Sequence, residues 1–159
     1  MGMHPRYRRG EGNSKSLRNH AVLLGYGRAG RQTLNTLKEH DIDFIVIDDD
    51  ASVINKLIQR GITCIQGDGS DKNILSQANA YEAKVILCSM RRSQDALSAL
   101  KLLSHSKARV LVRTFEPKDA VLVRDAGGCP VETAPATAES FINWMQANRL
   151  LCDSHSAES

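Results

Sequence analysis

The chain alternates short runs of apolar residues with longer segments in which apolar residues recur at the spacing of an α-helix. The run from Ala21 to Leu24 is continuously apolar, which is typical of a strand buried on both faces of a sheet. The segment after it places Ala29, Leu34 and Leu37 on one side of a helix. The same alternation predicts strands over residues 21–24, 44–47, 62–65, 84–88, 109–112 and 130–132, and helices over 28–39, 52–59, 72–78, 94–103, 118–126 and 136–150.

Strands that alternate with helices in this rhythm form βαβ units, which build a parallel sheet with helices on both faces. We therefore predict an α/β fold, a Rossmann-like doubly wound parallel sheet of about six strands with a C-terminal helix. Ligands of such folds bind in the crevice at the carboxyl ends of the strands. The predicted organisation is a basic flexible leader, a nucleotide-binding domain, an interface helix and a flexible tail, over residues 1–18, 19–134, 135–150 and 151–159.

Three glycines, Gly25, Gly27 and Gly30, stand at the spacing G-x-G-x-x-G between the first predicted strand and the first predicted helix. In that context the first glycine permits a tight turn, and the second lets the backbone approach a pyrophosphate. The third lets helix and strand pack closely. A helix that begins near Arg28 directs unpaired N–H groups and a partial positive charge toward phosphates. Without its flanking elements, the motif would equally describe an ordinary tight turn.

An acidic side chain stands at the end of the second predicted strand. Asp48 lies eighteen residues after Gly30, where a carboxylate accepts hydrogen bonds from ribose hydroxyls and repels a 2′-phosphate. Asp49 and Asp50 add negative charge and no arginine occupies this turn, so the pattern favours NAD or an adenosine nucleotide over NADP. The alternative interpretation of Asp49 and Asp50 is that they cap and charge the start of the next helix.

Further candidate residues follow the third, fourth and fifth predicted strands. Gly67 frees the backbone so that Asp68 can accept from the amino group of an adenine, although a plain turn acid fits the same position. Ser89 can bond a ribose or a phosphate. Arg113 can meet a phosphate or an acidic group across a subunit interface, or is a surface arginine without function. The predicted nucleotide-binding residues are Gly25, Tyr26, Gly27, Arg28, Ala29, Gly30, Asp48, Asp49, Gly67, Asp68 and Ser89.

The composition, 42% apolar and 25% charged over 159 residues, is that of one globular domain. The net charge is +3, and the first eighteen residues carry five basic side chains against one acidic one, so the remainder has no nucleic-acid footprint. The basic segment is a solvated leader or a linker along an acidic membrane surface or a partner protein. No apolar run approaches the ~20 residues that span a bilayer, and no signal peptide is present.

The cysteines are widely spaced, without a C-x-x-C pair or a neighbouring histidine at metal-ligand spacing. No metal site is predicted, and scattered thiols of this kind fit a reducing, cytoplasmic environment.

The segments VLLGYGRAG, FIVIDDD, GITCIQGDGSDKNIL and AKVILCS follow one another in an order and spacing that resemble the RCK domain. This domain is the regulator of potassium conductance, also called the Trk-system N-terminal domain. The GYGRAG form looks most like the cytosolic domains of Kef-type cation:proton antiporters and prokaryotic potassium channels, and the resemblance covers residues 19–141.

This resemblance implies a regulatory module that binds NAD(H), with AMP, ADP or ATP as alternatives, in the crevice of its first half. It also implies a homodimer or higher homo-oligomer, paired through helices of the second half, that acts on a membrane potassium channel or cation:proton antiporter. The matching family positions are Gly25, Gly27 and Gly30 for the phosphates, Asp48 for the ribose and Asp68 for the adenine side. The sequence shows neither a second ligand-binding lobe nor a membrane segment, so we expect a free-standing subunit or part of a longer protein.

Two other functions are compatible with a dinucleotide-binding fold. A small NAD-dependent oxidoreductase needs a proton-handling residue and a substrate pocket at the nicotinamide end, and the sequence offers no well-placed histidine. Cys88 is the candidate nucleophile nearest the crevice, and no base accompanies it, so no catalytic residue is predicted. The other possibility is a dimerisation scaffold whose pocket is unused. Candidate interface positions are residues 97–103 and 121–123 together with Phe141, Ile142, Trp144 and Met145.

Overall fold

In the computed structural model, residues 17–132, 142 and 144–149 are described. Within them, six strands form one parallel sheet in the order β3-β2-β1-β4-β5-β6. The prediction of a doubly wound, Rossmann-like parallel sheet is confirmed, because the order reverses between β1 and β4. The strands are β1 (Ala21–Leu24), β2 (Phe44–Asp48), β3 (Cys64–Gln66), β4 (Val85–Cys88), β5 (Arg109–Thr114) and β6 (Cys129–Glu132).

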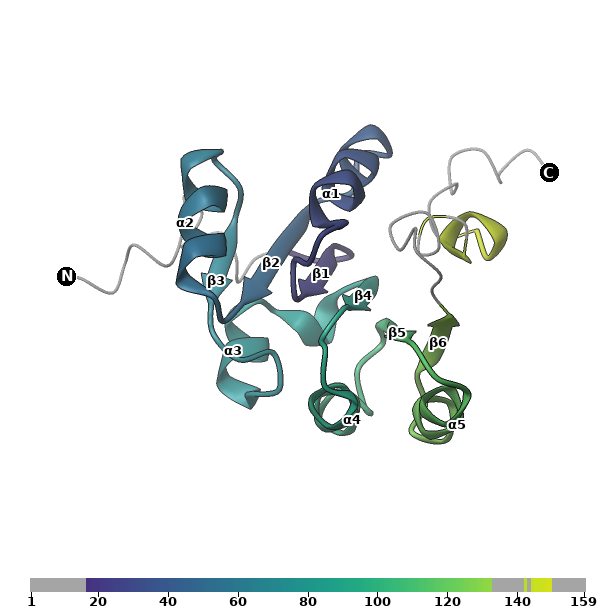
Figure 1. Cartoon of the computed structure of the whole chain (residues 1–159). Coiled ribbons are helices and arrows are strands. Elements are labelled where there is room, and N and C mark those ends of the chain that lie inside the picture. Colours follow the sequence, from purple (N-terminus) through teal and green to yellow (C-terminus); the bar gives the residue numbers. More distant parts are fainter. Residues whose placement is uncertain (1–16, 133–141, 143, 150–159) are drawn as a thin grey trace.

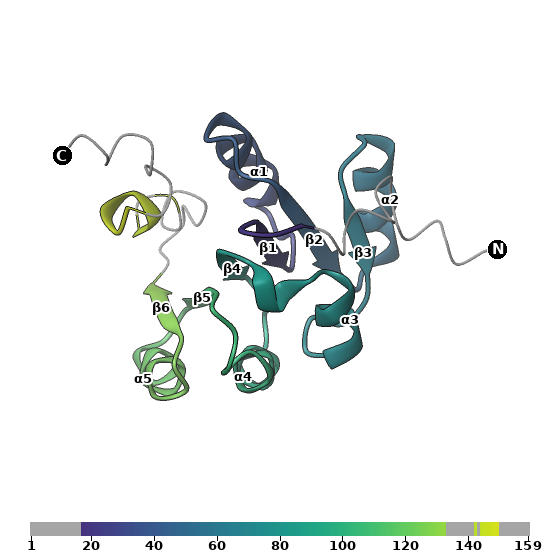
Figure 2. The same cartoon turned by 180° about the vertical axis from the view of Figure 1, so that it is seen from behind.

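Helices cover both faces of this sheet (Figures 1 and 2). On one face lie α1 (Gly30–Glu39) and α2 (Ala51–Gln59), together with a helical segment that includes residues 142 and 144–147. On the other face lie α3 (Lys72–Gln77), α4 (Ser93–Leu102) and α5 (Pro117–Asp125). A short 3-10 helix, η3 (Ala80–Glu82), precedes β4 and was not predicted from the pattern.

Side chains of β1 divide between two cores, because neighbouring residues of a strand point to opposite faces. Val22 and Leu24 pack with residues of α3 and α4, whereas Ala21 and Leu23 pack with residues of α1 and α2. All four are at most 3% exposed. The continuous apolar run therefore predicted burial on both faces correctly.

The first helix begins later than predicted. The pattern placed its start at Arg28, but Gly27 has a φ of +63° and α1 begins at Gly30. The turn of the glycine loop instead continues through Arg28 to Ala29, which is the residue that precedes the helix. In contrast, β5 continues to Thr114, two residues beyond its predicted end.

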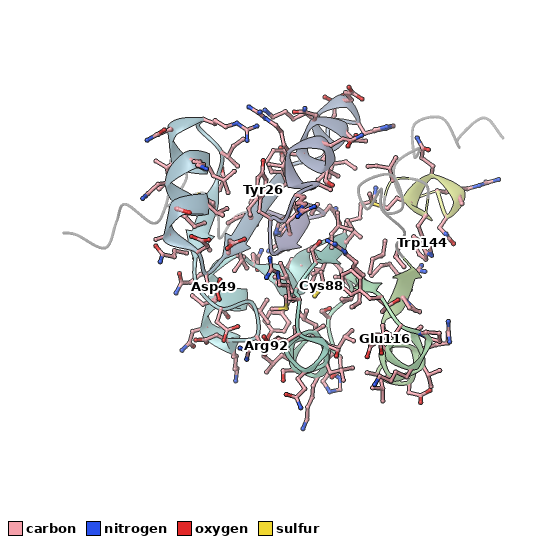
Figure 3. All side chains as sticks on the ribbon, viewed as in Figure 1. Tyr26, Asp49, Cys88, Arg92, Glu116 and Trp144 are labelled. Atoms are coloured by element: carbon pink, nitrogen blue, oxygen red, sulfur yellow. The ribbon has the colours of Figure 1, made fainter. Side chains whose placement is uncertain are left out.

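The residues at the two ends of the described core are attached to it. Leu17 packs against the core and its carbonyl oxygen accepts from Asn79 Nδ2 at 2.7 Å, while Arg18 lies 3.3 Å from Glu82. At the other end Met145 is fully buried and Trp144 is half-buried beneath the Arg109 guanidinium, 5.4 Å from its ring centre (Figure 3). Residues 1–16 of the predicted leader, most of the predicted interface helix and the predicted tail lie outside the described residues.

Candidate functional site

A groove of about 650 Å³ opens at the carboxyl ends of β1, β2, β3 and β4, where the strand order reverses. This is the position at which open α/β sheets bind ligands, and the volume is sufficient for a small molecule. Asp49, after β2, and Arg92, before α4, both line it and are labelled in Figure 3. The lining residues are Gly25, Gly27, Ile47, Asp48, Asp49, Asp50, Val53, Gly67, Asp68, Gly69, Ser89, Met90, Arg91, Arg92 and Asp95.

The glycine loop forms one wall of the groove. Gly25 and Gly27 adopt φ values of +92° and +63°, which side chains other than glycine rarely tolerate. The Gly25 N–H donates to the Ile47 carbonyl at 2.8 Å, which ties the loop to the neighbouring strand. A Cβ at Gly30 would lie 2.4 Å from the Tyr26 ring. The third glycine is therefore required by the loop's own tyrosine, which packs directly against the start of α1.

The start of α1 faces this loop without a capping side chain. Its N-cap residue is Ala29, no capping side-chain hydrogen bond forms among the described residues, and the first turn contains no acidic residue. In contrast, Asp50 caps α2 and Asp71 caps α3. An uncapped helix N-terminus beside glycines leaves main-chain donors and a partial positive charge for an anion.

Asp48 lines the groove and is held by two hydrogen bonds from main-chain N–H groups. Its Oδ2 accepts from the Tyr26 backbone N–H and its Oδ1 accepts from the Asp50 backbone N–H, each at 2.9 Å. Each carboxylate oxygen has a second lone pair, so both bonds leave capacity for ribose hydroxyls. The acid thus shapes the glycine loop and also presents acceptors to the groove.

The neighbouring acids have more than one role. Asp50 accepts from the Ser52 N–H and hydroxyl, each at 2.9 Å, and these bonds lower the pKa of Asp50. The helix-capping interpretation is therefore confirmed for Asp50, while Asp49 caps nothing and is exposed on the groove.

Asp68 forms a similar local turn. Its Oδ1 accepts from the Ser70 hydroxyl at 2.7 Å and from the Ser70 N–H at 2.8 Å, and these bonds lower its pKa. No hydrogen bond within the described residues involves Asp68 Oδ2, and the residue lines the groove. Asp68 can therefore hold its own turn through Oδ1 and still accept a hydrogen bond from an adenine through Oδ2.

The groove brings together seven of the predicted residues: Gly25, Gly27, Asp48, Asp49, Gly67, Asp68 and Ser89. Tyr26, Ala29 and Gly30 instead line a small adjoining hollow that also includes Ser89 and Arg113, and Arg28 is exposed on the loop. The Tyr26 hydroxyl accepts from Arg60 at 2.9 Å. The sequence analysis missed the charged groove residues Arg91, Arg92 and Asp95, which lie between the end of β4 and the first turn of α4. Their position just beyond the end of a strand was the signal that could have identified them.

Cys88, the candidate nucleophile of the sequence analysis, is not among the residues that line the groove, and neither are His20 and Glu116. Cys88 is fully buried, and burial raises the pKa of its thiol to about 11, so the thiolate is suppressed. His20 is buried before β1, where its Nε2 lies 3.0 Å from the Ala78 carbonyl. Glu116 precedes α5, near Lys118 (Figure 3). Within the described residues, no group of three or more His, Cys, Asp or Glu side chains is arranged to hold a metal ion.

Among the helices of the described residues, none combines the length and apolar character needed to cross a bilayer.

Sequence relatives of this chain include membrane transport proteins. It is 32% identical over 95 residues to potassium channel protein 1 of Methanocaldococcus jannaschii, covering 58% of this chain and 28% of the relative. It is 26% identical over 129 residues to the K(+) efflux antiporter KefB of Alkalimonas amylolytica, covering 78% of this chain and 19% of the relative. The chain therefore spans less than a third of the curated relatives that it matches.

Solved structures share the fold. The TrkA-N domain of the Escherichia coli inner membrane protein ybaL has a TM-score of 0.68 and 20% identity, covering 84% of this chain and 98% of that domain. The GsuK channel bound to NAD has a TM-score of 0.65 and 20% identity, covering 72% of this chain and 21% of the channel. The AMP-bound Kef domain of Shewanella denitrificans has a TM-score of 0.62 and 22% identity, covering 87% and 85% of the two chains.

A family model decides the classification. The TrkA-N domain model matches residues 21–132, which run from the first residue of β1 to the last residue of β6 and include every groove residue named above. This chain belongs to the TrkA-N domain family.

Proposed function

We propose that this chain is a regulatory domain that binds NAD(H), or alternatively AMP, ADP or ATP, and transmits the bound state to a membrane potassium channel or cation:proton antiporter. It acts at the cytoplasmic face of the membrane. The observation that carries the proposal is Asp48, an acid fixed by two main-chain N–H groups on the groove beside the glycine loop. This combination suits a ribose next to a phosphate.

The family relationship supports this proposal. Relatives that share this domain are named as a potassium channel and an antiporter, and structures of the same fold are described with NAD and with AMP. The match covers 28% and 19% of these two relatives, which is expected of a regulatory module that is one part of a transport system.

Regulation in this proposal is a shift between arrangements of paired domains. A nucleotide contacts β2 and β3 on one side of the glycine loop and β4 and α4 on the other, so it favours arrangements compatible with a closed groove. The proposed pairing surface includes Val121 and Leu122 on α5, which are 51% and 48% exposed. Among the other candidate interface residues, Leu100, Leu103 and Val123 are buried in the domain's own core and contribute structure instead.

Isothermal titration calorimetry with NADH, NAD, AMP, ADP and ATP tests the proposal. The Asp48→Ala variant should lose about 1–3 kcal/mol of binding free energy for adenosine nucleotides, the scale of a hydrogen bond to a charged group. Asp71→Asn is the matched control, because Asp71 also accepts from a main-chain N–H, at 2.8 Å, but is not a groove residue. Both variants should lose some thermal stability, whereas only Asp48→Ala should lose affinity.

Other results of these titrations would favour a different function for the chain. Turnover of NADH or hydrolysis of ATP by the wild-type chain would favour an oxidoreductase or another enzyme. Absence of binding by any of the five nucleotides would favour a dimerisation scaffold. Unchanged affinity in Asp48→Ala would remove Asp48 from the site.

A further inference from the structure

The two edges of the parallel sheet carry opposite charge. At the carboxyl edge, five acidic residues and two arginines line the groove: Asp48, Asp49, Asp50, Asp68, Asp95, Arg91 and Arg92. At the amino edge, the connections that lead into β1, β4 and β5 are residues 17–20, 80–84 and 101–109, and we call these three connections the basic edge. They carry five basic residues and one acidic residue: Arg18, Lys84, Lys101, Lys107, Arg109 and Glu82.

The three connections of the basic edge lie side by side. β1 pairs with β4 and β4 pairs with β5, so the residues that precede these strands are neighbours. The main-chain N–H of Lys84 donates to the His20 carbonyl at 2.8 Å, and the main-chain N–H of Arg109 donates to the Lys84 carbonyl at 3.1 Å. Arg18, Lys101, Lys107 and Arg109 are exposed. The chain therefore gathers positive charge from three distant segments on one part of its surface.

The acidic residue of the basic edge already faces two cations. Glu82 Oε1 lies 3.3 Å from Arg18 Nη1 and 3.5 Å from Lys107 Nζ. Two cations that share one carboxylate keep a net positive charge between them. The connections into β2 and β3, residues 38–43 and 56–63, carry three basic and three acidic residues and are balanced. The excess positive charge is thus confined to the middle of the amino edge.

The segment before β1 is attached to the basic edge. The Leu17 carbonyl accepts from Asn79 Nδ2 at 2.7 Å, and the Asn19 N–H donates to the Glu82 carbonyl at 3.0 Å. Residues 1–16 join the fold at this attachment. Their sequence contains four basic residues and one acidic residue: Arg6, Arg8, Arg9, Lys15 and Glu11. Further positive charge is therefore linked to the edge that is itself positive.

The chemistry of the basic edge suits lipid headgroups better than a protein partner. The core of a protein–protein interface is apolar and depleted of charged residues. Among the described residues, the large apolar side chains that are exposed are Phe115, Val121 and Leu122, and none of them belongs to the basic edge. A plane of anionic headgroups needs only charge, and each Lys or Arg near such a plane adds to the attraction.

We propose that the basic edge, together with the basic segment that joins it, is a docking surface for a bilayer of anionic lipids. The attraction falls off within a Debye length, so it acts through residues gathered on one edge of the domain. The groove lies at the opposite edge of the sheet and then faces away from the bilayer. This inference goes beyond the proposed function, because it does not require that the groove binds a nucleotide.

Cosedimentation of the full chain with vesicles tests the surface. At low salt the wild type should bind vesicles of equal parts phosphatidylcholine and phosphatidylserine but not vesicles of phosphatidylcholine alone, and high salt should release it. Lys101→Gln/Lys107→Gln should weaken binding about tenfold or more. Lys72→Gln/Lys118→Gln is the matched control, because both lysines are exposed at helix starts on the carboxyl edge and neither lines the groove. It should weaken binding by less than about twofold.

Two results would overturn the basic edge. The first is a wild type that does not bind the phosphatidylserine vesicles at low salt. The second is equal weakening by the two double variants, which would show that only the total charge of the chain matters. Both variants should keep the wild-type melting temperature, since the ion pair that Lys107→Gln removes is exposed and exposed pairs contribute little to stability. A loss of lipid binding at an unchanged melting temperature is therefore not a loss of folding.

The N-terminal segment needs its own variant. Arg6→Gln/Arg8→Gln/Arg9→Gln should also weaken vesicle binding, because the segment adds charge to the same surface. Binding that is lost in this variant but unchanged in Lys101→Gln/Lys107→Gln would assign docking to the segment alone and overturn the role of the folded edge.

The vesicle test is independent of the test of the proposed function. It is carried out without nucleotide, so a chain that binds no nucleotide would fail the proposed function and would still give a result for the basic edge. Added ADP or NADH should leave vesicle binding unchanged, because the groove and the basic edge lie at opposite ends of the strands. Competition between a nucleotide and the vesicles would contradict the assignment of lipid to the amino edge.

Discussion

The Tyr26 backbone N–H donates to Asp48 Oδ2 at 2.9 Å, which links the glycine loop to the end of β2. The acid that we propose for ribose binding therefore also fixes the loop that we propose for phosphate binding. A substitution of Asp48 therefore affects both parts of the groove. The loss of ribose binding can be separated from a distortion of the loop by comparing ligands that differ at the ribose.

Discrimination between NAD and NADP provides that separation. The wild type should bind NAD more tightly than NADP, because the fixed carboxylate of Asp48 repels a 2′-phosphate. Asp48→Ala should weaken NAD and bring the two affinities together, as measured by competition calorimetry. A general distortion of the loop would instead weaken both dinucleotides by the same factor, and Asp71→Asn should leave their ratio unchanged.

Gly30→Ala tests the packing of Tyr26 on the start of α1. Alanine would ordinarily favour a helix over glycine by about 0.5–1 kcal/mol, but here its Cβ meets the Tyr26 ring at 2.4 Å. We expect a net loss of about 1–3 kcal/mol in the free energy of unfolding, typical of overpacking. Urea denaturation measures it. The double variant Tyr26→Ala/Gly30→Ala should be more stable than the sum of the single effects predicts, and strict additivity would contradict this explanation.

Association through α5 can be tested with a single charge. Leu122 is 48% exposed, and its burial between two copies would favour pairing. Leu122→Asp should shift sedimentation toward the monomer without lowering the melting temperature. Lys118→Asp, on the exposed surface of the same helix, is the control for added negative charge. A wild type that stays monomeric across the accessible concentrations would exclude this surface.

His20 makes the stability of the domain sensitive to acid. Burial lowers the pKa of its imidazole below the ordinary 6.5, despite opposing effects of the Ala78 carbonyl and the Asp43 charge. The unfolded chain therefore binds more protons near and below pH 6.5, so the free energy of unfolding falls as the pH drops through that range. Each unit of pKa depression corresponds to about 1.4 kcal/mol.

The variant His20→Gln isolates this effect, because an amide can still donate to the Ala78 carbonyl and does not titrate. Its free energy of unfolding, measured by urea denaturation from pH 7.5 to 5, should depend less on pH than that of the wild type. Equal pH dependences would show that the buried imidazole does not contribute.

Cys88 should resist thiol reagents in the folded protein. Burial raises its pKa to about 11, so almost no accessible thiolate exists at pH 8. Alkylation with iodoacetamide, read by peptide mass spectrometry, should modify the half-buried Cys129 before Cys88, and should modify Cys88 only in denaturant. Rapid modification of Cys88 in native protein would reopen the case for a reactive thiol at the groove.

The sequence predicted the glycine loop and Asp48 because both depend on local context. A buried strand, a glycine turn and a helix are visible as apolar runs and spacing, and a residue at a strand end must lie at the sheet edge. It could not predict that Tyr26 packs on Gly30 or that α1 begins after Ala29, because backbone angles of loop residues depend on contacts with other segments. Trp144 illustrates the same limit: it was expected at an interface, and it is partly buried against the domain's own core.

The sequence alone determined the parallel α/β sheet, the side of the sheet that carries the ligand groove and the acids that follow β2 and β3, since periodicity and chain order fix these features. Only the tertiary structure decided which charges face one another. Arg28, Arg91 and Arg113 are far apart along the chain, and the reversal of strand order between β1 and β4 gathers them at one loop. Electrostatic interaction depends on distance through space, and sequence separation does not report that distance.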